Sequence, residues 1–261
     1  MARRLGLFSL VVLVLVAGAG AVLGIGVTPS PGKVDVPAVA SVAPVARDTL
    51  KSKPRRLAQD TLRRAAERLT LRVRNISCQG IATGSGFGID AHTIITNRHV
   101  LAGASVLELN TWDGTSLDAD VDESSTARLV DIGVTKVAAA LPAVADLGPD
   151  PKPGQRVTAV GYPLGGELTL SRGRVIGYLD GSKLPGEIAF PGRVMQVSSR
   201  IKHGNSGGPL LDSRGRVAGV IFAGEPGATA QDYMKVAYAI PLSSVRTLMQ
   251  AGGEERVTPC A

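Results

Sequence analysis

Short apolar runs, each broken after a few residues by Gly, Asn, Asp or Pro, follow one another along the chain from residue 71 onward. Such runs, bounded by turn residues, are typical of β-strands. One stretch near the C-terminus has helical spacing instead, with Ser243 or Ser244 as its N-cap and a Gly-Gly stop at 252–253. The pattern predicts an all-β domain over 71–261 with a short C-terminal helix. The predicted strands are 71–78, 80–89, 93–96, 105–109, 127–130, 156–161, 167–178, 194–199, 208–211, 217–222 and 236–240.

An interruption rich in proline, from residue 141 to residue 154, divides these strands into two groups. Strands arranged in this way indicate two β-barrels joined by a linker, at about 71–142 and 153–242. Hydrophobic residues make up 44% of the 261 residues, which is enough to fill a sizeable core. Glycine and proline together stay below the level that signals low complexity, so disorder is excluded as a description of the whole chain.

A different pattern precedes this domain, because residues 5–27 form a run of 23 residues without a charge. As a helix this run would reach about 34 Å, against a hydrocarbon core of about 30 Å. Arg3 and Arg4 in front of it favour a cytoplasmic N-terminus and an extracytoplasmic domain, on the periplasmic or cell-wall side. We expect residues 1–27 to be a single-pass transmembrane anchor. The alternative is a cleaved signal peptide and a secreted domain, because small residues offer a processing site within 17–21.

Two further segments connect the anchor to the domain. Residues 28–54 carry five prolines among Ala, Val and Ser, which predicts an extended stalk. Residues 55–70 place Leu and Ala near helical spacing with arginines on the other face, which predicts a short basic amphipathic helix. This helix docks onto anionic lipid or onto the domain, or it is a solvated basic linker.

The net charge of +7 raises the question of nucleic-acid binding, but the charge is unevenly distributed. Residues 1–75 hold 13 of the 29 Lys and Arg and only 4 of the 22 Asp and Glu, so the remaining residues are net acidic. Aromatic residues make up 3% of the chain, which leaves little to stack on bases. The basic charge therefore belongs to the N-terminal arm, and we exclude nucleic acid as a partner.

Three short segments carry candidate chemistry. The segment I-T-N-R-H-V closes an apolar strand with His99, L-V-D-I-G-V closes another with Asp131, and H-G-N-S-G-G-P-L places Ser206 in a glycine-rich turn. A serine hydroxyl becomes a nucleophile when a base lies within hydrogen-bond reach and a third group orients that base. Ser206, His99 and Asp131 supply these roles. The flanking glycines can turn backbone N–H groups toward a developing oxyanion.

Through these segments the chain resembles the trypsin-like (chymotrypsin-fold, S1-type) serine proteases in their compact bacterial form, which share the order His, Asp, Ser. It is also similar to actinobacterial membrane-anchored periplasmic serine proteases. The resemblance implies two six-stranded antiparallel Greek-key β-barrels with the active site in the cleft between them. Carried over residue by residue, it assigns catalysis to His99, Asp131 and Ser206 and the oxyanion hole to the backbone amides of Gly204 and Ser206. We expect no cofactor and no metal.

The same resemblance locates the primary substrate pocket a few residues before the nucleophile and on the strand that follows it. The candidates are Arg200, His203, Ile221, Phe222 and Ala223. No Asp stands at the pocket base to select Arg or Lys. A small apolar side chain is ranked first as the preferred substrate residue, whereas Arg200 either attracts an acidic side chain or points to solvent. His203 either lines the cleft or is a solvated loop histidine.

The remaining candidates receive structural interpretations. His92, in the turn D-A-H, is interpreted as a structural or surface residue. An acidic cluster lacks the ligand spacing of a calcium loop and predicts a charged hairpin surface. Its members are Asp113, Asp118, Asp120, Asp122 and Glu123.

The chain has two cysteines, Cys78 and Cys260. The predicted topology places both outside the reducing cytosol, where a disulfide is allowed. If it forms, this bond ties the C-terminal tail to the first barrel. It then serves either as a structural staple or as a redox control of the active-site cleft.

The leading hypothesis is a membrane-anchored extracytoplasmic serine endopeptidase that acts on polypeptides through an acyl-enzyme on Ser206. Its partners would be a polypeptide substrate and the lipid membrane, which it contacts through residues 5–27. One alternative is a noncatalytic protease-fold scaffold that holds partners at the membrane. Another is a latent protease that becomes active when its arm is cut in the basic stretch 51–56.

Overall fold

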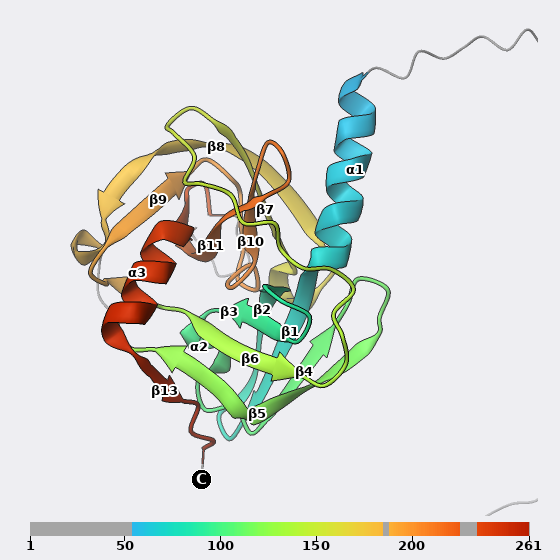
Figure 1. Cartoon of the computed structure of the whole chain (residues 1–261), viewed down its shortest axis with the longest axis vertical. Coiled ribbons are helices and arrows are strands. Elements are labelled where there is room, and N and C mark those ends of the chain that lie inside the picture. Colours follow the sequence, from blue (N-terminus) through green and yellow to red (C-terminus); the bar gives the residue numbers. More distant parts are fainter. Residues whose placement is uncertain (1–53, 185–187, 225–233, 261) are drawn as a thin grey trace, which may run out of the picture. The chain divides into compact units, whose positions relative to one another are not determined.

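The computed structural model describes residues 54–184, 188–224 and 234–260, which are drawn in colour in Figure 1. The predicted anchor 1–27 and all of the predicted stalk except Pro54 lie outside these residues. Within the described ranges, no helix is both long enough and apolar enough to span a membrane.

Six antiparallel strands form the first barrel. They are β1 (Thr70–Ser77), β2 (Gly80–Gly88), β3 (Thr93–Thr96), β4 (Val106–Asn110), β5 (Ser116–Ala127) and β6 (Gly133–Val137). The sheet order is β5-β4-β1-β2-β3-β6, and β5 also pairs with β6, which closes the sheet. Because successive side chains of a strand point to opposite faces, every second residue reaches the interior. Leu71, Val73, Ile94 and Leu109 fill it and are buried.

The second barrel is built in the same way. Its strands are β7 (Arg156–Gly161), β8 (Thr169–Asp180), β9 (Arg193–Val197), β10 (Pro209–Asp212), β11 (Val217–Gly224) and β12 (Ala237–Pro241). They close in the order β10-β11-β12-β9-β8-β7 around Ala159, Met195, Leu210 and Ile221. The two closed six-stranded antiparallel barrels confirm the predicted all-β class.

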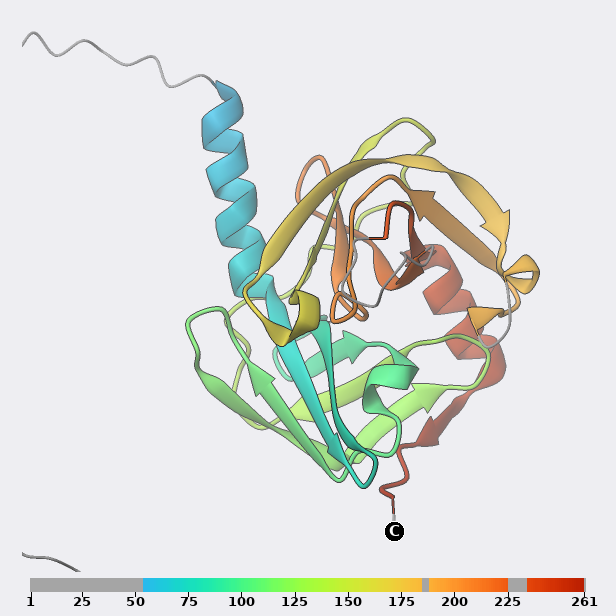
Figure 2. The ribbon, with the colours of Figure 1, turned by 180° about the vertical axis from the view of Figure 1, so that it is seen from behind.

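Several short helices flank the barrels. They are α1 (Pro54–Leu69), α2 (Arg98–Leu101), α3 (Leu242–Gly252) and the 3₁₀ turns η1 (Pro163–Gly165) and η2 (Gly181–Lys183). Figure 2 shows α1 leading directly into β1. The C-terminal half of α1 packs onto the domain, because Ala66 and Leu69 are buried in its core and Arg68 donates a hydrogen bond to the Pro142 carbonyl at 3.0 Å.

The strand predicted at 127–130 is wrong. β5 ends at Ala127 and residues 128–130 form a bend. The pattern also fails to predict β5 and β6, because acidic and serine side chains occupy outward positions of β5 and a bulge between Asp120 and Ser125 interrupts its ladder with β6.

The acidic cluster is on the surface, as predicted: four of its members are exposed on β5 and Asp113 is exposed in the turn before it.

The predicted N-cap of the C-terminal helix is also wrong. Pro241 occupies the N-cap position of α3 without a side-chain hydrogen bond. Ser243 instead donates its hydroxyl to Asp150 at 2.5 Å, and Ser244 donates to the Arg193 carbonyl at 3.2 Å. The glycine stop is correct, because Gly253 follows the helix with a φ of +68°.

The C-terminal tail is attached to the first barrel twice. β13 (Glu254–Arg256) pairs antiparallel with β5, and Cys260 forms a disulfide with Cys78 just beyond the end of β1. The two Cα atoms are 5.9 Å apart. The tail therefore runs from α3, which packs against the second barrel, to the outer edge of the first.

Replacing both cysteines with serine is expected to lower the melting temperature. The disulfide closes a separation of 182 residues, for which chain entropy gives an upper figure of about 5 kcal/mol. Calorimetry of the wild type and of Cys78→Ser/Cys260→Ser, each with and without reductant, measures the effect. Reductant should lower the wild-type melting temperature and leave that of the double variant unchanged. Equal melting temperatures for the oxidised wild type and the double variant would contradict a stabilising role.

Candidate active site

His99 lies in α2, the single helical turn that follows β3, and not at the end of a strand as the sequence predicted. The next two residues, Val100 and Leu101, are buried in the first-barrel core and fix this turn, whereas the His99 side chain is 50% exposed. Its Nδ1 lies 2.7 Å from Asp131 Oδ2, and its backbone N–H donates to Asp131 Oδ1 at 3.1 Å. One carboxylate thus orients both the backbone and the ring of the histidine.

Asp131 lies in the turn between β5 and β6, which corrects its predicted place at the end of a strand. Val130 and Ile132 on either side of it are fully buried and anchor the turn. The side-chain amide of Asn97 donates to the Asp131 carbonyl at 2.6 Å and ties this turn to the residue before α2. Sequence reasoning did not single out Asn97. Its place two residues before His99 is the signal that could have identified it.

Ser206 lies in a tight turn that leads into β10. Asn205 supports this turn twice, because its N–H donates to the Lys202 carbonyl at 3.1 Å and its Oδ1 accepts from the Lys202 N–H at 3.1 Å. Gly204 and Gly207 have φ angles of +93° and +83°, which residues with a Cβ rarely adopt. The glycines of the motif thus permit the turn, and they leave Ser206 half-buried.

The nucleophile turn, residues 203–208, packs against β2 of the first barrel. The Ser85 N–H donates to the Ser206 carbonyl at 2.7 Å. A Cβ on Gly84 would lie 2.7 Å from the methyl groups of Val100 and 3.2 Å from the Ser206 carbonyl oxygen, so α2 and Ser206 both approach this one residue. Among the residues described, no hydrogen bond joins Ser206 Oγ to His99. Hydrogen bonds of this kind are often long without substrate and tighten when it binds.

Two backbone amides of the nucleophile turn are available to a ligand. Within the part of the chain that the structure describes, the N–H groups of Gly204 and Ser206 donate to no protein atom. The His203 carbonyl accepts from the Leu164 N–H at 2.7 Å. Because the C=O and N–H of a trans peptide point in opposite directions, this bond turns the Gly204 N–H away from Leu164. Two free donors beside a serine hydroxyl can stabilise an oxyanion.

Leu164 adopts an unusual backbone conformation to make this bond. Its φ is +55°, a positive value that no other non-glycine residue described here has. Tyr162, just before η1, is buried, and its hydroxyl donates to the Thr70 carbonyl at 3.3 Å. Burial raises the pKa of Tyr162 to about 12, so its ring stays neutral beside the nucleophile turn.

The candidate pocket residues separate into two groups. Ile221 lies in the interior of the second barrel with 0% exposure, and Phe222 is 4% exposed and packs against Phe190 with the ring centroids 5.6 Å apart. Both side chains are therefore covered in this structure, and their part in a substrate pocket stays a prediction. Ala223 is half-buried, whereas Arg200 and His203 are exposed.

His92 has a structural role. Its ring Nδ1 lies 3.1 Å from the Val137 carbonyl, and its backbone N–H donates to the Asp90 carboxylate at 2.8 Å. Because a carbonyl only accepts, the first bond requires the tautomer with its proton on Nδ1, and it attaches the turn between β2 and β3 to the end of β6. The second bond lies within that turn.

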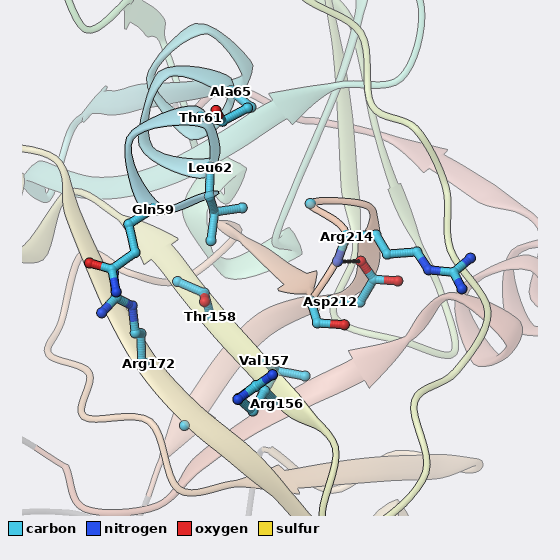
Figure 3. Close-up of a pocket in the computed structure, with 13 residues that line it drawn as sticks. Gln59, Thr61, Leu62, Ala65, Arg156, Val157, Thr158, Arg172, Asp212 and Arg214 are labelled. Carbon is cyan, nitrogen blue, oxygen red and sulfur yellow. Dashed lines mark hydrogen bonds between the residues drawn. The ribbon is translucent and has the colours of Figure 1, made fainter. Parts of the chain in front are cut away.

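A separate cavity of about 690 Å³ lies between α1 and the second barrel (Figure 3). Gln59 and Leu62 of α1 face Thr158 and Arg172 across it, and the candidate catalytic residues are not among its lining. Asp212 lies at the rim of this cavity. Its carboxylate accepts hydrogen bonds from the backbone N–H groups of Arg214 and Arg216 and from the Arg216 guanidinium. Burial alone would raise the pKa of Asp212, but these hydrogen bonds outweigh burial and lower it.

Residues 84–220 match the family model of the trypsin-like peptidase domain. The chain is 32% identical over 188 residues to a Do-like HtrA serine protease of Bacillus subtilis, covering 67% of this chain and 40% of the relative. It is 36% identical over 177 residues to the chloroplastic Do-like protease 1 of Arabidopsis thaliana, covering 62% and 37%. The chain thus spans about two fifths of the length of these curated relatives.

The fold also matches solved structures. The active form of the Rv3671c protease of M. tuberculosis superposes with a TM-score of 0.63 at 25% identity, covering 78% of this chain and 88% of that one. The matched family segment contains all three of His99, Asp131 and Ser206.

Gly207→Ala is expected to destabilise the protein more than Gly215→Ala. The two glycines have φ angles of +83° and +81°, so alanine carries a similar backbone cost at both, roughly 1–2 kcal/mol. A Cβ on Gly207 would overlap the Ser85 carbonyl and the Thr96 hydroxyl, whereas one on Gly215 meets Leu62 at an ordinary 3.4 Å. Overpacking adds about 1–3 kcal/mol at Gly207 alone. Thermal unfolding followed by circular dichroism measures the difference, and equal losses would contradict the close approach of the turn to β2.

Proposed function

Because the chain belongs to the trypsin-like peptidase family, and its relatives include serine proteases, we propose that it is a serine endopeptidase with Ser206, His99 and Asp131 as its catalytic triad. Its substrates are polypeptides. The observation that carries this proposal is the pair of contacts between Asp131 and His99, at 2.7 Å to the ring and 3.1 Å to the backbone.

These contacts prepare His99 to act as a base. A carboxylate accepts hydrogen bonds and donates none, so the proton in the contact to Asp131 belongs to Nδ1 of the imidazole. The lone pair of the neutral ring then lies on Nε2. The histidine is thereby held in the tautomer and the orientation in which it can take a proton from Ser206.

The triad assignment implies the following reaction. Ser206 Oγ attacks the carbonyl carbon of the scissile peptide bond while its proton moves to His99 Nε2. The oxygen of the tetrahedral intermediate gains negative charge and accepts hydrogen bonds from the N–H groups of Gly204 and Ser206. The C–N bond then breaks as His99 gives its proton to the leaving amine. Water repeats these steps on the acyl-enzyme, which releases the carboxylic acid and restores the serine.

We further infer that the domain works outside the cytoplasm, held at the membrane by residues 5–27. The uncharged length of this segment and the arginines before it support this topology. The Cys78–Cys260 disulfide is typical of an oxidising compartment. Carbonate extraction of membranes from cells expressing the full chain should leave the protein in the membrane pellet. Its release into the supernatant would contradict the anchor.

Ser206→Ala and His99→Ala are expected to abolish hydrolysis of fluorogenic casein by the full chain, because the first removes the nucleophile and the second removes its base. Asp131→Asn should lower kcat by about 10⁴-fold, since the wrong tautomer of the base is then favoured. His92→Ala is the matched control, because His92 is an exposed histidine of the same barrel with a structural contact, and it should keep wild-type turnover.

Three outcomes bear on this proposal. Wild-type-like turnover by Ser206→Ala or His99→Ala would contradict the triad. A folded wild type without turnover would favour the scaffold. Turnover that begins only after the arm is cut would favour the latent protease.

A further inference from the structure

Ser85 is a buried residue of β2 whose polar groups all bind at the boundary between the two barrels. Its N–H donates to the Ser206 carbonyl at 2.7 Å, and its carbonyl accepts from the Thr96 hydroxyl at 2.7 Å. Its own hydroxyl donates to the Gly204 carbonyl at 2.7 Å and accepts from the Tyr162 N–H at 2.9 Å. The side chain therefore bonds both the nucleophile turn and the residue that begins the neighbouring turn.

The position of the Ser85 hydroxyl is fixed by its surroundings. A Cβ on Gly161 would lie 2.8 Å from Ser85 Oγ and 2.9 Å from the side-chain nitrogen of Asn205, so the hydroxyl fits against bare backbone. Its donor and its acceptor functions are both used. In a close-packed site these two hydrogen bonds allow one orientation of the hydroxyl.

The contacts of Ser85 fix the short segment 203–204 at both of its ends. At the first end, the Leu164 N–H holds the His203 carbonyl at 2.7 Å, and Tyr162, which opens the same turn, donates to Ser85. At the second end, Ser85 holds the Gly204 carbonyl. The Gly204 N–H lies between these two fixed carbonyls and donates to nothing in the described protein.

The geometry points to Ser85 as a positioning residue that holds the Gly204 N–H in the direction required of an oxyanion donor. This inference rests on the proposed function. Ser85 does not touch the reacting atoms and acts through the peptide groups on either side of Gly204. Glycine has few steric limits on rotation, so without this hydroxyl the two peptide groups that flank Gly204 can rotate and change the direction of its N–H.

Ser85→Ala tests this inference. The variant leaves the Gly204 carbonyl and the Tyr162 N–H without partners, and buried unpaired groups drive the backbone to rearrange. The probe is a fluorophosphonate, in which Ser206 Oγ attacks phosphorus, fluoride leaves, and the serine proton passes to His99. The phosphoryl oxygen takes the place of the oxyanion. Full-chain protein labelled over a range of probe concentrations gives the maximal labelling rate, kinact, and the concentration for half-maximal rate, KI.

The two constants, kinact and KI, are expected to respond differently to the substitution. Ser85→Ala should lower kinact about 10–100-fold, since the misplaced N–H is one of the oxyanion donors, and KI should change by less than about threefold, because ground-state binding does not use it. Labelling is measured well below the melting temperature of each variant.

Ser124→Ala is the matched control. Ser124 is also a buried serine of the first barrel, and its hydroxyl lies 2.7 Å from both the Asp120 carbonyl and the Thr135 hydroxyl, in β5 and β6 and not at the nucleophile turn. It should lose stability in the same way as Ser85→Ala while its kinact stays at the wild-type value. A merely structural Ser85 would behave as Ser124 does.

The outcomes distinguish the role of Ser85 from the proposed function. A wild type that labels, together with a Ser85→Ala whose kinact is unchanged, contradicts the role of Ser85 and leaves the proposed function intact. A folded wild type that neither labels nor hydrolyses casein contradicts the proposed function and, with it, this inference. If Ser85→Ala does not fold, Ser85→Cys keeps the shape of the side chain with a weaker donor. It should then show the same fall in kinact, and an unchanged kinact would contradict the inference.

Discussion

The nucleophile turn lies so close to β2 that a side chain at Gly207 would overlap the Ser85 carbonyl, and this contact joins the two barrels at the candidate site. Buried backbone groups need hydrogen-bond partners, and here the Ser206 carbonyl finds one in the Ser85 N–H at 2.7 Å. In the same turn the N–H groups of Gly204 and Ser206 donate to no protein atom among the described residues. The positions of the nucleophile and of the oxyanion donors both depend on this one contact.

Each barrel contributes one part of the candidate site. The first barrel holds His99 against Asp131 through a helical turn and the bend between β5 and β6, both anchored by buried neighbours. The second barrel supplies Ser206 from a turn that only glycine-rich sequence permits. The proposed base and nucleophile therefore come from two separately closed sheets, so that on this proposal a change at the barrel boundary alters the chemistry without touching a catalytic side chain.

Much of this could be predicted from the sequence, since apolar runs between turn residues mark most strands and the glycine-rich motif marks the Ser206 turn. The strand β5 could not, because acidic side chains on its outward positions hide its alternation. The burial of Ile221 and Phe222 depends on how β11 packs against its paired strands and against Phe190, which a local pattern does not show. Ser85 and Asn97 escaped notice for the same reason, because their importance comes from partners across the fold.

The central claim is that Ser206 is an activated nucleophile. Treating the purified full chain with diisopropyl fluorophosphate and locating the adduct by tandem mass spectrometry of its peptides tests this most directly. We predict one phosphoryl group on Ser206 in the wild type and none in His99→Ala. A folded wild type with an unmodified Ser206, or equal modification of Ser206 in His99→Ala, would contradict the account.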